Sequence, residues 1–287
     1  MARHRWLLSV LGTLAFGTVT AEAQAYCRTT TCNAKTETCR MVDGCQRSGT
    51  PIVWTSQPIP YRFHGRAPEH LDRDEARGSI RLAFARWTEV VCPNGRRTSL
   101  RFREGPEIPA AQARGKEPFG IYFRDDGWPH DDVNETLALT TQLFRDRSGE
   151  VQYSDIEVNS GQHQFALRDT DKGKDLEAVI THEVGHYIGL AHSPERDSIM
   201  TPQYCQAEER CSATKELSRD LGEDDVAAVC ALYPPEGTWV SREPESSGCA
   251  VAHSPASESC TTPAASALLA CAALLAARAK RRARRPL

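Results

Sequence analysis

Residues 182–192 read H-E-x-x-H-x-x-G-x-x-H, and no other stretch constrains the chain as strongly. On a helix, His182 and His186 are four residues apart and project from the same face, so their imidazoles can bind one side of a Zn²⁺ ion. Glu183 then directs its carboxylate towards the open side of the metal, where a water molecule can bind. The pattern predicts a helix that carries a metal site, and the weaker alternative is a polar helix with surface histidines.

The rest of the motif supplies a third ligand. Gly189 can adopt a left-handed conformation after the last helical turn, and such a turn would deliver His192 to the metal. Three protein ligands with one open position are typical of a catalytic zinc site, whereas structural zinc sites are closed by four ligands. We therefore predict one catalytic Zn²⁺ held by His182, His186 and His192.

A methionine-containing stretch, residues 198–202, follows the motif. The extended motif with such a methionine turn resembles the metzincin metalloproteases, and the matrixin branch in particular. Pro202 stands two positions after Met200, as in matrixins, whereas astacins and serralysins place a tyrosine there that can reach the metal. The resemblance implies that Met200 forms a hydrophobic floor beneath the metal without binding it. It also implies that Tyr204 lines the neighbouring substrate pocket.

The resemblance covers residues 51–235 and implies an α/β (α+β) fold. The expected features are a twisted mixed sheet, an active-site helix, zinc at the floor of a cleft, and a smaller C-terminal subdomain after the third histidine. The implied reaction is hydrolysis of a peptide bond by a metal-activated water, with Glu183 as general base. A bound peptide would add antiparallel to an edge strand through backbone groups. The expected substrate-binding residues of that strand are Leu137, Ala138, Leu139 and Thr140.

Two other functions are compatible with the same fold. One is a catalytically inactive surface protein that serves binding or adhesion, and it is disfavoured because the three histidines and Glu183 are all present. The other is a zinc hydrolase that acts on cell-wall peptides. The sequence contains no serine or cysteine nucleophile motif, which favours metal-dependent hydrolysis without a covalent enzyme intermediate.

Hydrophobic spacing predicts the elements around the motif. Apolar residues at intervals of three and four predict a helix over residues 71–91, with Asp72 or Asp74 as its N-cap. Asp175 is the expected N-cap of the helix that carries the motif. The buried stripe of that helix is expected to comprise Leu176, Val179, Ile180, Val184 and Ile188. Strand patterns occur at residues 59–63, 99–102, 120–123, 137–144 and 151–159.

Both ends of the chain differ in character from this domain. A basic start, an apolar run and small-residue cleavage sites predict a secretory signal peptide at residues 1–25. Residues 236–263 read as a polar linker, and residues 264–287 combine a hydrophobic segment with an arginine-rich end. With Cys249, this tail resembles the C-terminal sorting signals of myxobacterial surface proteins, which implies membrane contact before processing. We expect export to an extracellular or outer-membrane-associated location at the cell surface.

Eight of the 11 cysteines lie between the predicted signal and the C-terminal tail, consistent with four disulfides in an exported protein. Four of them lie in residues 26–50, a Cys-rich N-terminal segment. The short spacing of Cys205 and Cys211 favours a local pair, and the other pairings stay open. A Cys₄ zinc module in the N-terminal segment is a weaker alternative because the segment has no C-x-x-C spacing.

Two further metal features of matrixins are not expected here. The cysteine that caps the zinc in matrixin pro-segments lies in a P-R-C-G context, and Cys45 lacks that context, so latency by a cysteine switch is not predicted. The second, structural zinc of matrixins is bound by three histidines and an aspartate, but residues 124–132 contain only His130. The carboxylates of this stretch could hold Ca²⁺, but they have no regular ligand spacing, which favours a solvated loop.

The net charge of the chain limits the kinds of molecule that it is expected to bind. The predicted signal contains two arginines and one glutamate, and residues 249–287 contain six basic residues and one glutamate. The remaining body has 27 Lys and Arg against 36 Asp and Glu, a net charge of −9. An acidic body argues against nucleic acid or an anionic membrane as partner. We expect a monomer that acts on protein or peptide substrates.

Overall fold

The computed structural model describes residues 26–112, 118–167, 172–204 and 219–236. The chain divides into two units, Met1–Val240 and Ser241–Leu287, and all described residues belong to the first. The predicted signal peptide, the Cys205–Cys211 pair and the C-terminal tail lie outside the described residues, and these predictions stay open. No helix within the described ranges is long and apolar enough to cross a membrane.

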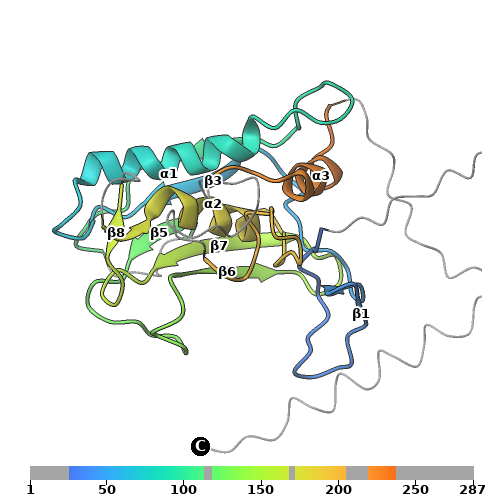
Figure 1. Cartoon of the computed structure of the whole chain (residues 1–287), viewed down its shortest axis with the longest axis horizontal. Coiled ribbons are helices and arrows are strands. Elements are labelled where there is room, and N and C mark those ends of the chain that lie inside the picture. Colours follow the sequence, from blue (N-terminus) through green and yellow to red (C-terminus); the bar gives the residue numbers. More distant parts are fainter. Residues whose placement is uncertain (1–25, 113–117, 168–171, 205–218, 237–287) are drawn as a thin grey trace, which may run out of the picture. The chain divides into compact units, whose positions relative to one another are not determined.

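Five strands form the central sheet, in the order β4-β3-β5-β7-β6. Figure 1 labels β3, β5, β7 and β6 of this sheet. Their bounds are Ile59–Phe63 for β3, Phe102–Glu104 for β4, Gly120–Phe123 for β5, Ala138–Phe144 for β6 and Val151–Val158 for β7. Strands β4, β3, β5 and β7 are parallel, and β6 runs antiparallel to β7 at one edge. This mixed sheet with its helices confirms the predicted fold class.

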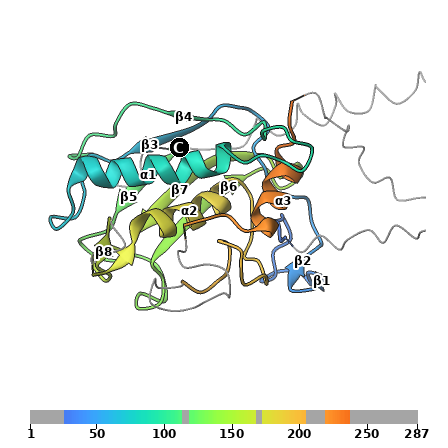
Figure 2. The ribbon, with the colours of Figure 1, turned by 45° about the horizontal axis from the view of Figure 1, so that its top comes forward.

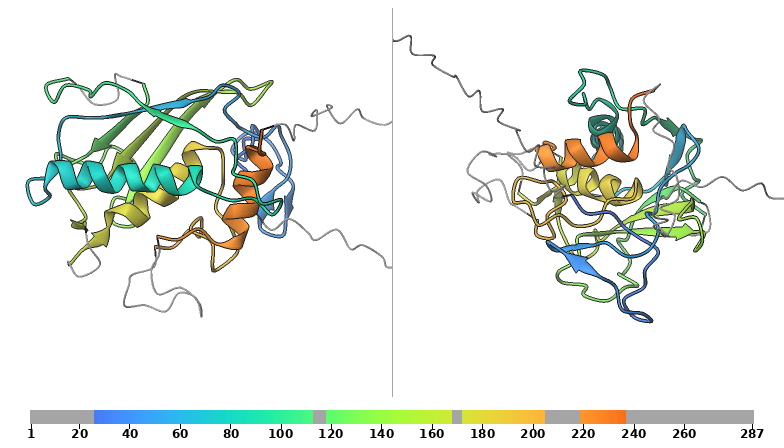
Figure 3. Two further views of the ribbon diagram at one scale, coloured as in Figure 1. Left: turned by 90° about the horizontal axis from the view of Figure 1, so that it is seen from above. Right: turned by 90° about the vertical axis from the view of Figure 1, so that its right-hand side faces the viewer.

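The two longer helices lie side by side over one face of the sheet, as Figures 2 and 3 show. Helix α1 spans Arg73–Thr88 and α2 spans Leu176–Tyr187. Trp87 of α1 is fully buried, and its indole nitrogen donates to the carbonyl oxygen of Thr181 in α2 at 2.9 Å. Burial of such a large aromatic side chain contributes roughly 2–3 kcal/mol. The position of α2 is therefore set by α1 as well as by the sheet.

The predicted helix at residues 71–91 is confirmed with slightly shorter bounds. Asp72 is its N-cap, because its carboxylate accepts from the backbone N–H of Glu75 at 2.8 Å. The strand predicted at residues 99–102 is wrong in its bounds, since β4 begins only at Phe102. Thr98 and Ser99 instead donate to the carbonyl oxygen of Tyr233, at 2.6 and 3.1 Å. Those bonds hold this stretch against the C-terminal part of the domain.

Three disulfides lie within the described residues. Cys27–Cys45 and Cys32–Cys39 close the N-terminal segment, and Cys92–Cys230 joins the loop after α1 to helix α3, Glu223–Leu232. Because all four N-terminal cysteines are paired, the alternative of a Cys₄ zinc module is excluded. The segment also contains an unpredicted hairpin of two short strands, β1 at Met41–Val42 and β2 at Cys45–Gln46. A second small sheet pairs β8, Phe165–Ala166, with β9, Lys174–Asp175.

Candidate metal centre

Helix α2 carries the first two histidines of the motif and is capped at its N-terminal end. Asp175 is the N-cap, as predicted, and accepts from the backbone N–H of Ala178 at 3.0 Å. Arg219 donates to the Asp175 carboxylate at 2.7 Å and therefore anchors the cap. The predicted apolar stripe is buried at every position: Leu176, Val179, Ile180, Val184 and Ile188. This burial fixes which face of α2 is left for His182 and His186.

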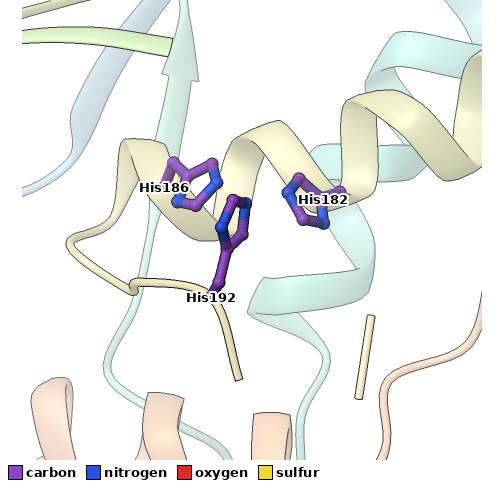
Figure 4. Close-up of side chains that lie close together, drawn as sticks. All are labelled: His182, His186 and His192. Carbon is purple, nitrogen blue, oxygen red and sulfur yellow. The ribbon is translucent and has the colours of Figure 1, made fainter. Parts of the chain in front are cut away.

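The turn after α2 brings the third histidine back towards the helix. Gly189 has φ +103°, the left-handed conformation that the motif requires. A Cβ at this position would also collide with the carbonyl oxygen of Ile52, so the turn needs glycine for two separate reasons. The chain then reverses, and His192 lies beside His182 and His186 (Figure 4).

The three imidazoles form one cluster. One potential ligand atom from each of His182, His186 and His192 lies within 4.8 Å of the other two. The ring centroids of the three pairs are 4.8, 5.2 and 4.9 Å apart. The first two rings are half-buried and the third is exposed, so the cluster is open on one side. Three nitrogen donors and an open side match the donor set of a catalytic zinc site.

Hydrogen bonds to the backbone select the tautomer of two of these rings. Nδ1 of His182 lies 2.7 Å from the carbonyl oxygen of Ile199, and Nδ1 of His186 lies 2.9 Å from that of Leu190. Because a carbonyl oxygen only accepts, Nδ1 carries the proton in both rings and Nε2 keeps its lone pair for a metal. The site therefore fits a zinc ion in the chemistry of its donors as well as in their number.

The surroundings keep these imidazoles neutral. Desolvation, with a smaller contribution from the nearby His192, lowers the pKa of His182 to about 4. Desolvation, followed by the proximity of His182, also lowers the pKa of His186. The pKa of His192 falls to about 4 for the same kind of reason, with His186 as its neighbour. Neutral imidazole is the form that binds a metal, so the site is ready for one at neutral pH.

Glu183 lies next to the cluster and is only 6% exposed. Its Oε2 accepts from the hydroxyl of Thr140 at 2.6 Å, and the same hydroxyl lies 3.0 Å from the backbone oxygen of Glu183. Desolvation raises the pKa of the carboxyl, while His186 and Thr140 lower it. A buried carboxylate with a raised pKa is suited to exchange a proton near neutral pH.

The methionine turn packs directly beneath α2. Met200 is buried, and a Cβ at Gly185 would collide with its sulfur. Asp225 at the start of α3 holds this turn, since its carboxylate accepts from Ser198 Oγ at 2.5 Å and from the Ile199 N–H at 2.8 Å. Ile199 is the residue whose carbonyl oxygen accepts from His182. Asp225 is thus linked to the cluster through the turn, a role that its position in the sequence does not reveal.

The sequence comparison agrees with this geometry. A family model described as Matrixin matches residues 53–234, well over half of the chain. The chain belongs to the matrixin family. The match begins just after the Cys-rich N-terminal segment and ends at the close of α3, so it contains the sheet, the cluster and the methionine turn.

Several matrixin relatives align with the same region. The chain is 31% identical over 183 residues to the hatching enzyme of Paracentrotus lividus, and the aligned region covers 63% of this chain and 26% of the relative. It is 30% identical over 174 residues to metalloendoproteinase 1-MMP of Arabidopsis thaliana, with coverage of 58% and 40%. Human matrix metalloproteinase-26 is 28% identical over 197 residues, with coverage of 68% and 66%. The chain therefore spans between about a quarter and two thirds of these relatives' length.

In this matrixin, the strand expected to bind substrate lies at the sheet edge beside α2. Ala138, Leu139 and Thr140 belong to β6, and Leu137 immediately precedes it. Tyr204 lies at the N-terminal end of α2, where its hydroxyl accepts from the Asp175 N–H at 2.8 Å. The edge position of β6 is compatible with a peptide that adds to it. Substrate binding by these five residues stays a prediction.

The acidic loop of this matrixin is tied to the sheet by an ion pair and a hydrogen bond. Glu157 of β7 pairs with Arg124 and lies 2.5 Å from Nε2 of His130. Desolvation and the nearby Arg124 lower the pKa of His130. Within the described residues, the cluster of three histidines is the group of metal-binding side chains that gathers in one place. The structure thus adds no support for a calcium ion or a second zinc at this loop.

Proposed function

We propose that this matrixin is a zinc-dependent endopeptidase that hydrolyses peptide bonds. The observation that carries the proposal is the cluster of three neutral imidazoles, His182, His186 and His192, with the buried carboxylate of Glu183 beside it. The curated relatives have names such as metalloendoproteinase and matrix metalloproteinase, which supports the same class of activity.

The residues of the site have separate roles in the proposed reaction. The three histidines would hold the metal, with Nε2 of His182, Nε2 of His186 and one ring nitrogen of His192 as the donors. A zinc ion bound there supplies Lewis-acid polarisation of the scissile carbonyl and acidifies a water molecule. Glu183 takes a proton from that water and passes it to the leaving amine. Thr140 holds the carboxylate in place before the proton moves, and Met200 gives the site an apolar floor.

The substrate is proposed to lie along β6. The strand pairs with β7 on one side only, so its other edge has backbone groups that an extended peptide can bond. Thr140 contacts Glu183, and Gln142 donates to the Tyr187 carbonyl oxygen at 3.1 Å, so β6 runs along α2 towards its C-terminal end. An antiparallel peptide would therefore place its N-terminal residues beside Gln142 and its scissile bond near Glu183.

We also propose the following organisation for the chain. Residues 1–25 act as a signal peptide, residues 26–50 form the Cys-rich segment, and residues 51–235 form the protease domain. A polar linker at 236–263 precedes a sorting tail at 264–287. The three disulfides within the described residues support passage through an oxidising compartment. The expected destination is the cell surface or the extracellular space.

The test uses purified protein with two substrates, casein and isolated cell-wall peptides. The proposal predicts that casein is cleaved, that a chelator abolishes cleavage, and that added Zn²⁺ restores it. Cleavage of cell-wall peptides alone would favour a zinc hydrolase that acts on cell-wall peptides. Zinc binding without cleavage of either substrate would favour an inactive binding protein. Cleavage that is unaffected by the chelator would contradict the proposal.

A further inference from the structure

The N-terminal segment lies outside the family match and runs beside the turn that carries the third histidine. The N–H of Thr29 donates to the carbonyl oxygen of Gly189 at 2.9 Å, and the N–H of Ala191 donates to that of Cys27 at 3.0 Å. Arg28 and Leu190 form the antiparallel bridge between them. Backbone groups just before His192 are therefore satisfied by a separate segment, more than 150 residues earlier in the chain.

The side chain of Thr29 extends this contact to a second histidine. Its hydroxyl donates to the carbonyl oxygen of Leu190 at 2.9 Å. The same carbonyl oxygen lies 2.9 Å from Nδ1 of His186 and so fixes the tautomer of that ring. Thr29 of the N-terminal segment thus orients the Leu190 carbonyl group, and this carbonyl group orients His186, a proposed zinc ligand.

The Cys27–Cys45 disulfide links two contacts that lie on either side of His192 in the chain. On one side of this histidine, the backbone carbonyl oxygen of Cys27 accepts a hydrogen bond from the N–H of Ala191, as described above. On its other side, a Cβ at Gly44 would lie 3.5 Å from Cβ of Pro194, so the tip of the β1–β2 hairpin packs against the chain there. The Cys27–Cys45 disulfide joins these two contacts, and both of its cysteines are buried. Figure 2 shows the hairpin at the same end of the molecule as α3.

We propose that residues 26–50 are a clamp that positions the metal site. In this clamp, Thr29 is a positioning residue for His186, and the Cys27–Cys45 disulfide holds the turn that carries His192. The inference deepens the proposed function and rests on it, because it concerns the same zinc ion. Groups that orient metal ligands from outside the metal's own coordination shell typically change metal affinity about 10–100-fold.

The first experiment measures the zinc affinity of the whole exported protein by competition with a chromophoric chelator. Thr29→Val keeps the backbone bonds and the shape of the side chain but removes the hydroxyl. We expect its zinc affinity to fall by up to about tenfold, because Thr29 acts on His186 through the Leu190 carbonyl and not directly. Thr29→Ser keeps the hydroxyl and should retain the parent affinity. Thr31→Val is the matched control, because its hydroxyl accepts from the Thr50 N–H within the segment and does not contact the turn.

The second experiment compares the two disulfides of the segment. The double variant Cys27→Ala/Cys45→Ala should lose zinc affinity, whereas Cys32→Ala/Cys39→Ala should bind zinc like the parent. Thermal unfolding of each metal-free variant shows whether a loss of affinity merely follows a loss of fold. The threonine variants keep the test decisive if the first double variant does not fold.

The outcomes separate the two proposals. If the parent binds zinc and Thr29→Val binds it equally tightly, the clamp is wrong and the zinc site stands. Equal losses in Thr29→Val and Thr31→Val would also contradict it, because they would reflect general loosening of the segment. If the parent binds no zinc at all, the proposed function fails and the clamp fails with it.

Discussion

At the scale of single residues, the hydrogen bond from Thr140 is one of the contacts that set the pKa of Glu183, the proposed general base. Burial raises the pKa of Glu183, and the hydrogen bond from Thr140 lowers it again. Charge-assisted hydrogen bonds of this kind contribute roughly 1.5–3 kcal/mol. The sequence places Thr140 on the strand proposed to bind substrate, but only the structure reveals that its hydroxyl donates to Glu183, the proposed general base.

The pH dependence of hydrolysis tests this contact. Glu183 must be ionised to accept a proton, so kcat/KM falls as the pH drops through its pKa. Thr140→Val removes the bond that lowers the pKa, and the pKa therefore rises. We expect the acidic limb of the kcat/KM profile to move to higher pH, because the ionised carboxylate loses a hydrogen bond that favours it.

Thr141→Val is the matched control for that profile. Thr141 is the next residue on β6, its side chain is exposed, and it points to the other face of the strand. Its substitution should leave the acidic limb where it lies in the parent. An unchanged profile in Thr140→Val, or an equal shift in both variants, would disprove the role of the Thr140 hydroxyl.

At the scale of elements, the packing of α2 on the methionine turn depends on Gly185. A Cβ at this position would collide with the sulfur of Met200 and lie 3.0 Å from Met200 Cε and Trp87 Cζ2. Gly185→Ala should therefore destabilise the protein by about 1–3 kcal/mol through overpacking. Chemical denaturation of the purified protein measures this change as a lower midpoint.

Gly78 in helix α1 provides the control for the Gly185→Ala substitution in α2. It lies inside α1, and a Cβ there would meet nothing within 4 Å. Gly78→Ala should therefore stabilise the protein by about 0.5–1 kcal/mol, because alanine loses less backbone entropy than glycine in a helix. If Gly185→Ala proved as stable as Gly78→Ala, the close packing of α2 on Met200 would be contradicted.

Periodicity in the sequence predicts many of these elements, because regular spacing of apolar residues marks the side chains that an element buries. Helices α1 and α2 and the strands β3, β5, β6 and β7 follow from the sequence patterns, whereas α3 does not. The start of β4 does not, since Thr98 and Ser99 bond to Tyr233, which is 135 residues away from Thr98. The metal site also combines local and distant contacts. Local spacing predicts His182, His186 and His192, whereas the contact of Thr29 with Leu190 spans 161 residues and cannot be read from such spacing.

At the scale of the whole molecule, the Cys92–Cys230 disulfide joins distant parts of the domain. The two cysteines are 138 residues apart in the sequence, whereas Cys32 and Cys39 are 7 apart. A cross-link that closes a longer loop removes more entropy from the unfolded chain. For loops of these lengths, that model gives roughly 5 kcal/mol for the long loop and roughly 2.5 kcal/mol for the short one.

Two pairs of alanine substitutions test this difference. Cys92→Ala/Cys230→Ala should lower the free energy of unfolding more than Cys32→Ala/Cys39→Ala does, as measured by denaturant titration. Both variants should keep the parent zinc affinity, because neither disulfide contacts the histidine turn. A larger loss of stability from the short loop would show that native contacts, and not loop closure, dominate the effect.

The central claim is that three histidines hold zinc while Glu183 moves the proton. Its most direct test measures zinc content and casein hydrolysis on the same samples of the parent and of Glu183→Ala. We expect one zinc per chain in both proteins and loss of most of the turnover in the variant. A variant that still cleaved casein at the parent rate, with its zinc retained, would contradict the assignment of Glu183 as general base.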